Sequence, residues 1–411
     1  MGGPDGAASR ESGGKARDAS PPASKARSCR LTRSMRLSLP QASPGLPGVD
    51  EHIPGVAGRV KRDGPRMGKL LESGRVQAMR FGVYLPTFAW ADLTFEQAAR
   101  VKTFARKAED LGFAALWVAE HFLVAPGLYG TVWMSPLLCL AHAASVTSRI
   151  RLATGLLIVP YYHPVPLARE IQTLHHLSNG RFVLGVGPGW DQKEFETLGM
   201  KLGERGRRTD EIIAALRRLL TERDVSFEGR YYRFEHVSID PLPGFPELWV
   251  GGGSKIKTAL SPDKTYIAPT VLARIAGADG WLARAAGSQQ MVKDDVQAIR
   301  AYLEGQGRDP SSVRYGHLNF AHLVDTTDRE KALALQRPHI ERVMGTHRTF
   351  ENLQESYFLG TTREIVERIA DLERAGIQDM VLATCGDDLE QLERFASEIV
   401  AKFPADRTKS R

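Results

Sequence analysis

From residue 79 onwards, short apolar runs alternate with longer segments in which apolar residues recur every three or four positions. A short apolar run between turn residues is typical of a buried strand, and a spacing of three or four is typical of an amphipathic helix. The predicted strands cover residues 81–85, 114–119 and 151–159, the apolar run between Arg181 and Asp191, and residues 248–251, 279–283, 315–324 and 379–383.

Capping and stop residues mark several helices between these runs. Thr94 and Gln97 form a capping-box pattern at the start of a helix that ends at Gly112. Pro136 stands at the first position of a second helix. Further helices are predicted at 165–177, at 207–220, from Pro269, and between Thr361 and Gly376 with Glu364 as the capping partner. Residues 226–239 alternate as a hairpin or an extended excursion does.

Eight apolar strands that alternate with helices, at a spacing of about 35 residues, predict a parallel (β/α)8 TIM barrel. We expect it to form a single domain over residues 79–403. In barrels of this kind the active site lies at the C-terminal ends of the strands. The segments expected there are residues 86–90, 120–122, 154–156, 185–194 and 251–254.

Composition changes this picture only at the ends of the chain. Residues 1–78 are rich in Gly, Pro, Ser, Ala and Arg, and hold 14 Lys or Arg against 7 Asp or Glu. Such a segment cannot bury enough apolar surface to offset its ordering entropy, so we predict a disordered basic tail. A short polar tail is expected at 404–411. Met67 and Met79 are candidate translation starts besides Met1.

The formal charge of +7 is carried by the basic tail. The remaining residues hold 41 Lys or Arg and 41 Asp or Glu, so net charge does not indicate a nucleic-acid partner. No apolar run approaches the length of a membrane span. Cys29, Cys139 and Cys385 lack a C-x-x-C spacing, which predicts a reducing, cytoplasmic setting without a structural zinc site. The histidines also lack metal-ligand spacing, and we expect no metal.

The apolar run before Asp191 carries glycines at alternate positions, Gly185, Gly187 and Gly189. Because glycine lets the backbone approach a flat or phosphorylated ligand closely, this strand end is a candidate ligand loop. A dinucleotide fingerprint of the G-x-G-x-x-G type would need its third glycine at Trp190, and the strand lies in mid-chain. We therefore set the Rossmann interpretation aside.

Three motifs together resemble one family. They are Arg149–Pro164 (RIRLATGLLIVPYYHP), Leu177–Trp190 (LSNGRFVLGVGPGW) and Trp249–Ser254 (WVGGGS). In this order they resemble the luciferase-like flavin-dependent oxidoreductases, and most closely the branch that depends on the deazaflavin coenzyme F420. The resemblance spans residues 79 to about 403. It implies a barrel of the bacterial luciferase-like type, a bound flavin or deazaflavin, and a homodimer, but it does not identify the substrate.

His121 follows Glu120 at the end of the second predicted strand and is the candidate catalytic residue. Imidazole is suited to proton transfer near neutral pH. In the deazaflavin-dependent relatives a histidine of such a pair lies beside the cofactor ring, and the resemblance implies the same place here. The alternative is a histidine that caps a loop or pairs with Glu120.

The resemblance assigns the cofactor to three further strand ends. Thr154, Gly155 and Leu156 align with a bulge behind the ring, where a non-prolyl cis peptide joins Gly155 to Leu156. Gly187, Gly189 and Trp190 would line the ring or its linker, and Gly252, Gly253 and Ser254 would form a nest of N–H groups for the cofactor phosphate. The alternatives are a packing glycine, a core tryptophan and a flexible turn, respectively.

Two departures from the family pattern bear on the site. Some hydride-transferring relatives carry a glutamate where this chain has Trp190, so that proton donor is absent. Glu194 is interpreted as a first-turn helix residue rather than as its replacement. Residues 255–267 are expected to form an extra loop, whose Lys255, Lys257 and Lys264 are interpreted as solvated surface charges, with phosphate or carboxylate contacts as the alternative.

The sequence thus predicts an oxidoreductase that uses coenzyme F420 for hydride transfer to or from a small organic substrate. The alternative is an FMN-dependent monooxygenase, in which reduced flavin reacts with oxygen. A separate flavin or F420 reductase is the expected protein partner, with no nucleic acid and no membrane. An alternative of another class is a non-catalytic flavin- or deazaflavin-binding protein, whereas a metal-dependent barrel hydrolase lacks ligands in the sequence.

Overall fold

The computed structural model describes residues 78–90, 94–123, 131–254, 266–345 and 347–403. The predicted tails at 1–78 and 404–411 lie outside these ranges, apart from Ala78, and so do the three lysines of the predicted extra loop. The properties expected of those segments stay predictions.

Eight parallel strands close into a barrel, which confirms the predicted (β/α)8 fold. They are β1 (Arg80–Tyr84), β3 (Ala115–Val118), β5 (Arg151–Thr154), β7 (Phe182–Gly187), β10 (Glu247–Gly251), β11 (Gly280–Ala283), β12 (Arg314–Ala321) and β13 (Asp379–Thr384). Each pairs in parallel with the next in this order, and β13 pairs with β1 to complete the circle.

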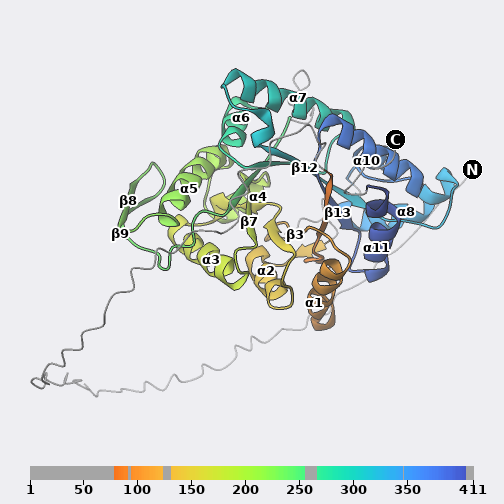
Figure 1. The fold of residues 1–411 in the computed structure, drawn as a ribbon, viewed down its shortest axis with the longest axis horizontal. Coiled ribbons are helices and arrows are strands. Elements are labelled where there is room, and N and C mark those ends of the chain that lie inside the picture. The colour runs from red at the N-terminus through yellow and green to blue at the C-terminus, as the bar shows by residue number, and fades with distance from the viewer. Residues whose placement is uncertain (1–77, 91–93, 124–130, 255–265, 346, 404–411) are drawn as a thin grey trace, which may run out of the picture. The chain divides into compact units, whose positions relative to one another are not determined.

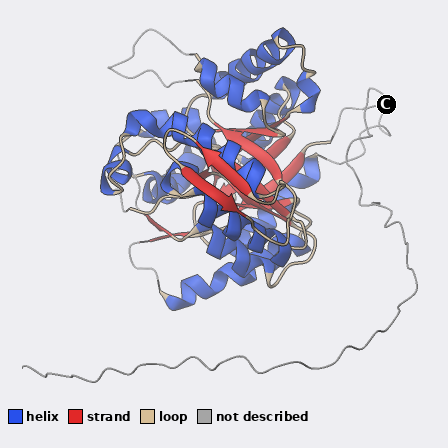
Figure 2. Ribbon diagram, turned by 90° about the vertical axis from the view of Figure 1, so that its left-hand side faces the viewer, coloured by secondary structure: helices blue, strands red, loops and turns tan. Residues whose placement is uncertain are grey.

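Helices surround the barrel, as Figure 1 and Figure 2 show. They are α1 (Phe95–Asp110), α2 (Pro136–Ala144), α3 (Pro164–Leu177), α4 (Gln192–Thr197), α5 (Arg205–Leu219), α6 (Pro269–Ala276), α7 (Gln289–Gly305), α8 (Arg329–Met344), α9 (Phe350–Ser356), α10 (Thr362–Ala375) and α11 (Leu389–Arg394). The predicted capping box of Thr361 and Glu364 starts α10, and Gly376 ends it with a φ of 110°. The side chain of Gln97 lies outside the described part, so the box predicted at Thr94 is not tested.

The third predicted strand, 151–159, is interrupted. Residues 151–154 form β5, a cis peptide bond joins Gly155 to Leu156, and the chain returns as β6 (Leu157–Ile158) before a 3-10 turn. The cis bond is the one that the resemblance implies. Because apolar residues continue on the far side of Gly155, the sequence pattern did not show where the strand breaks.

Two antiparallel ribbons lie outside the barrel sheet. β8 (Val225–Glu228) pairs with β9 (Arg233–Val237), which confirms the hairpin predicted at 226–239. β2 (Phe88–Trp90) pairs with β4 (Thr131–Trp133), which joins the segment after β1 to the segment between β3 and α2.

Two tryptophans fill the barrel interior. The indoles of Trp117 and Trp249 meet edge to face with their ring centroids 5.3 Å apart, and both side chains are buried. A Cβ added to Gly316 would lie 2.7 Å from Trp249, and one added to Gly82 would lie 2.7 Å from Trp117. These strand positions are glycine because two bulky rings occupy the space.

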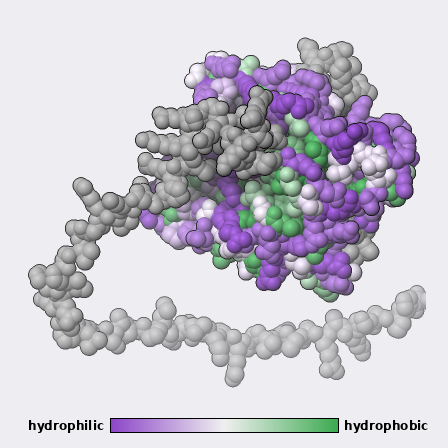
Figure 3. Space-filling model, turned by 45° about the vertical axis from the view of Figure 1, so that its right-hand side comes forward, coloured by the Kyte–Doolittle hydropathy of each residue, from purple (hydrophilic) through white to green (hydrophobic). Residues whose placement is uncertain are grey.

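No helix in the described ranges combines the length and the apolar character needed to cross a membrane. On the face that Figure 3 shows, hydrophilic residues predominate, and hydrophobic residues gather near the middle. Among the large hydrophobic side chains, Phe95, Leu138 and Leu177 are strongly exposed.

Candidate active site

The site residues predicted from the sequence follow four strands that are neighbours in the barrel. These strands are β3, β5, β7 and β10, and all of them run in the same direction. Their C-terminal ends therefore lie on one rim. The chain segments that carry His121, Gly155, Gly189 and Gly253 meet there, although up to 132 positions separate them in the sequence.

Glu194 holds the segment after β3 in place. Its carboxylate lies in the first turn of α4, as expected, but the side chain is only 1% exposed. Oε1 accepts the backbone N–H groups of Phe122 at 2.8 Å and Leu123 at 3.2 Å. Oε2 lies 3.4 Å from Nδ1 of His121 and accepts the hydroxyl of Tyr161 at 2.6 Å. One carboxylate thus fixes both the backbone and the ring of the candidate catalytic segment.

The charge on Glu194 determines which protons its neighbours carry. Burial acts to raise its pKa, but the hydrogen bonds from His121 and Tyr161 outweigh burial and hold it at about 2. Burial and this carboxylate also raise the pKa of Tyr161. Because an ionised carboxylate only accepts hydrogen bonds, we assign the proton of His121 to Nδ1.

Aromatic rings flank His121. The ring of Trp133, from β4, lies 5.4 Å from the imidazole, and that of Trp190 lies 5.6 Å away, edge to face. Trp190 is 49% exposed, so it stands at the opening rather than in the core. Phe88 packs on Trp133 at 5.6 Å and on Phe320 at 6.0 Å. This rim therefore offers flat apolar surfaces next to one proton-transfer group.

Glu120 binds the segment that follows the bulge at Thr154, Gly155 and Leu156. Its buried carboxylate accepts the N–H of Ile158 at 2.6 Å and the hydroxyl of Tyr162. Burial raises its pKa to about 7. The carboxylate paired with His121 is thus that of Glu194, and the pairing with Glu120 that the sequence left open is not the one found.

The bulge at Thr154, Gly155 and Leu156 is enclosed by the chain itself. Thr154 Oγ1 donates to the carbonyl of Gly185 and accepts its N–H, at 2.7 and 2.8 Å. The Leu156 side chain lies against β7 and β10: a Cβ on Gly187 would be 3.1 Å from Leu156 Cδ1, and one on Gly251 would overlap it. These glycines make room for Leu156.

Other predicted ligand glycines also have neighbours from the chain. Gly189 has a φ of 74°, and a Cβ there would lie 2.6 Å from Ile158. Gly252 has a φ of 142°, with Val271 2.9 Å from the Cβ position. Their roles in cofactor binding remain predictions, because local packing alone already requires glycine.

Asp295 occupies part of the predicted phosphate nest. From α7, its carboxylate accepts the N–H of Ser254 at 3.0 Å and the hydroxyl at 2.5 Å, and a Cβ on Gly253 would collide with it. Burial raises the pKa of Asp295. Ser254 therefore gives its own donors to a carboxylate, a partner that lies 41 residues away and that no local motif indicated.

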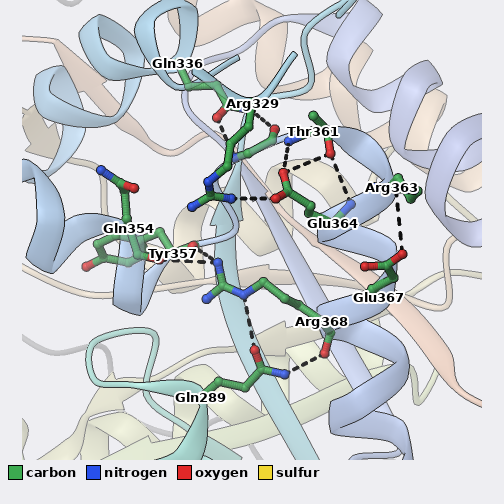
Figure 4. Close-up of polar contacts among 11 residues, drawn as sticks. Gln289, Arg329, Gln336, Gln354, Tyr357, Thr361, Arg363, Glu364, Glu367 and Arg368 are labelled. Carbon is green, nitrogen blue, oxygen red and sulfur yellow. Dashed lines mark hydrogen bonds and ion pairs between the residues drawn. The ribbon is translucent and has the colours of Figure 1, made fainter. Parts of the chain in front are cut away.

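A groove of about 630 Å³ lies between α7, α9 and α10. None of the sequence-predicted site residues lines it. Its polar groups are paired with one another (Figure 4): Arg329 meets Glu364 at 2.7 Å, and Arg368 donates to Gln289 at 3.1 Å. Within the described ranges no three His, Cys, Asp or Glu side chains gather as metal ligands would.

Comparison with known proteins points to one family. The family model described as luciferase-like monooxygenase matches residues 79–397. The FMNH(2)-dependent dimethylsulfone monooxygenase of Pseudomonas fluorescens (strain Pf0-1) is 26% identical over 364 residues, which are 79% of this chain and 94% of that protein.

Solved structures share the fold. The monooxygenase RslO1 from Streptomyces bottropensis matches with a TM-score of 0.65 at 23% identity, over 79% of this chain and 100% of that one. An F420-dependent secondary alcohol dehydrogenase, in complex with an F420-acetone adduct, matches with a TM-score of 0.63 at 18% identity, over 80% of this chain and 98% of that one.

Proposed function

This chain belongs to the luciferase-like monooxygenase family and is a flavin- or deazaflavin-dependent oxidoreductase, and we propose that its cofactor is coenzyme F420 and its reaction a hydride transfer to or from a small organic substrate. The observation that carries the proposal is the setting of His121. Its Nδ1 faces the ionised Glu194, and two indoles flank its ring at the opening of the barrel. A flat redox cofactor that needs a proton partner fits this set of groups.

The residues of the chain supply the proton and the orientation. When bound, the reduced deazaflavin supplies a hydride from its C5 carbon. If the acceptor is a carbonyl, its carbon takes the hydride and its oxygen must take a proton, which protonated His121 donates. In the reverse direction neutral His121 removes the proton of the alcohol. The carboxylate of Glu194 holds the imidazole in position in both directions.

Trp133 and Trp190 would then hold the flat ring and limit water at the site. Both indoles already contact the imidazole, so a ring placed beside them is also beside the proton donor. Holding the two reacting groups in one geometry lowers the barrier by converting a bimolecular step into a unimolecular one.

The second candidate is an FMN-dependent monooxygenase. A specific observation favours it: the relative that is similar over 94% of its own length is an FMNH(2)-dependent monooxygenase. In this version a separate reductase would supply reduced flavin, and oxygen would be a co-substrate. The same rim and the same His121 would serve, so the two candidates differ in cofactor rather than in site.

Ligand-free protein titrated with F420 and, separately, with FMN tests the choice. Absorbance changes give the two affinities, and oxygen uptake is followed with each reduced cofactor and a panel of small alcohols and ketones. We expect F420 to bind more tightly and to turn over without oxygen uptake. Tighter FMN binding with substrate-coupled oxygen consumption would replace the proposal by the second candidate. Binding without turnover of any substrate favours the non-catalytic binder.

A further inference from the structure

Arg284 directly follows β11 and so lies on the rim of the candidate site. Its side chain is half-buried, and Nη2 is shielded from solvent without a hydrogen-bond partner among the described residues. Burial lowers the pKa of this guanidinium, but an arginine keeps its charge at physiological pH. A shielded cationic donor without a partner is unfavourable, so its presence needs an explanation.

The half-buried Arg368 shows how this chain usually treats such a group. Its guanidinium donates to Gln289 at 3.1 Å and to the backbone carbonyls of Gln354 at 3.3 Å and Tyr357 at 2.7 Å (Figure 4). Burial lowers the pKa of Arg368 as well. Its donors are thus committed to the fold, and those of Arg284 are not.

The loop predicted to hold a phosphate is the neighbour of Arg284. Gly251, which precedes this loop, is in register with Leu282, two residues before Arg284. Asp295 connects the two segments, because it accepts both donors of Ser254 and its charge acts on Arg284. Among the described residues no hydrogen bond joins Asp295 to Nη2 of Arg284, so this donor is left to offer a ligand.

We propose that Arg284 is the binding residue of an anion site on this rim, and that the anion is the phosphate group of the cofactor. A planar guanidinium with parallel N–H donors matches two phosphate oxygens, which makes arginine well suited to this task. FMN and F420 both carry a phosphate. The assignment to the cofactor rests on the proposed function; a phosphorylated substrate would offer the same chemistry to the same side chain.

FMN and riboflavin differ only in the phosphate and so isolate this contact, whereas F420 and its phosphate-free core also differ in the tail that the phosphate carries. The dissociation constants of FMN and riboflavin, and of F420 and its phosphate-free riboflavin-like core, are measured for wild type, Arg284→Met and Arg284→Lys. Arg223→Met is the matched control, because Arg223 is exposed and paired with Asp240. We expect Arg284→Met to weaken the phosphate-bearing ligand about 10- to 100-fold, the range of a charge-assisted hydrogen bond, and to leave its phosphate-free analogue unchanged. Arg284→Lys should restore part of the loss.

Inorganic phosphate separates the two sources of the anion. Arg284→Met can leave unchanged the ratio of dissociation constants between each cofactor and its phosphate-free analogue, yet abolish the binding of inorganic phosphate to cofactor-loaded protein. In that case the anion belongs to the substrate and the site stands. If neither the ratios nor phosphate binding respond, the proposal is overturned. Failure of wild type to bind any flavin or deazaflavin would instead contradict the proposed function, and phosphate binding by wild type against Arg284→Met would still decide the role of Arg284.

Discussion

Oε2 of Glu194 lies 3.4 Å from Nδ1 of His121, although 73 positions separate the two residues in the chain. One follows β3, and the other stands in the first turn of the helix after β7. They meet because β3, β5 and β7 are successive strands of the barrel, so their loops share a rim. The 3-10 turn after β6 supplies Tyr161 as a second donor to the same carboxylate.

Replacing His121 with asparagine should remove the proton-transfer group and leave the aromatic surfaces in place. We expect kcat to fall about 10²- to 10⁴-fold, the usual contribution of general acid–base catalysis. The dissociation constant of the cofactor should change little. Single-turnover kinetics and cofactor titration measure the two effects, with His142→Asn, an exposed histidine of α2, as the control. An unchanged kcat would show that His121 is not the proton partner.

Glu194→Gln should lower stability in a pH-dependent way. The folded pKa of about 2 lies below the ordinary 4.5, so the carboxylate stabilises the fold above pH 4.5 and loses this effect as the pH falls through 2. The shift corresponds to about 3 kcal/mol at neutral pH. Urea unfolding should show a deficit of this order near pH 7 that shrinks below about pH 4. Glu196→Gln, on the exposed face of the same helix, should show no such trend.

Glu120→Gln should behave in the opposite sense. Burial raises the folded pKa of Glu120 to about 7, so its contribution is fully present below pH 4.5 and is lost as the pH rises through 7. Wild type should therefore lose up to about 3 kcal/mol between pH 5 and 8, and the neutral glutamine variant should not. Denaturant titrations across this range measure how the free energy of unfolding changes with pH in wild type and in the variant. The same pH dependence in both proteins would mean that Glu120 is not protonated in the folded protein.

Gly251→Ala should destabilise the barrel because its new Cβ overlaps Leu156 Cδ1. Overpacking of this kind typically lowers the free energy of unfolding by about 1–3 kcal/mol. Adding Leu156→Ala should recover part of the loss, so the double variant is less destabilised than the sum of the single ones. Gly203→Ala, where no atom lies within 4 Å of the Cβ position, is the control. Additive effects would contradict a direct contact.

The fold was largely predictable because its signals are local. Each apolar run of strand length appears as a strand, and Thr361, Glu364 and Gly376 delimit α10 as their capping roles require. The placement of His121 at a strand end followed from the same pattern. The interruption of the third strand was visible only through the resemblance, because the apolar pattern resumes directly after Gly155.

The partners of the site residues were not predictable in the same way. Glu194 was correctly placed in a first helical turn, but whether its side chain faced solvent or His121 depends on which loops the closed barrel brings next to α4. Asp295 gave no signal as the acceptor of Ser254, since helix α7 carries other acidic residues of the same type. Arg284 likewise resembles any polar residue that ends a strand.

The sequence by itself determined the order and type of the elements, the parallel barrel and the rim on which chemistry is expected, because periodicity, caps and turns act over a few residues. Only the tertiary structure decided which side chains the glycines make room for, which carboxylate meets His121 and which arginine keeps unused donors. Those relations join residues tens of positions apart, and they exist only once strand pairing has closed the barrel and brought the strand ends together.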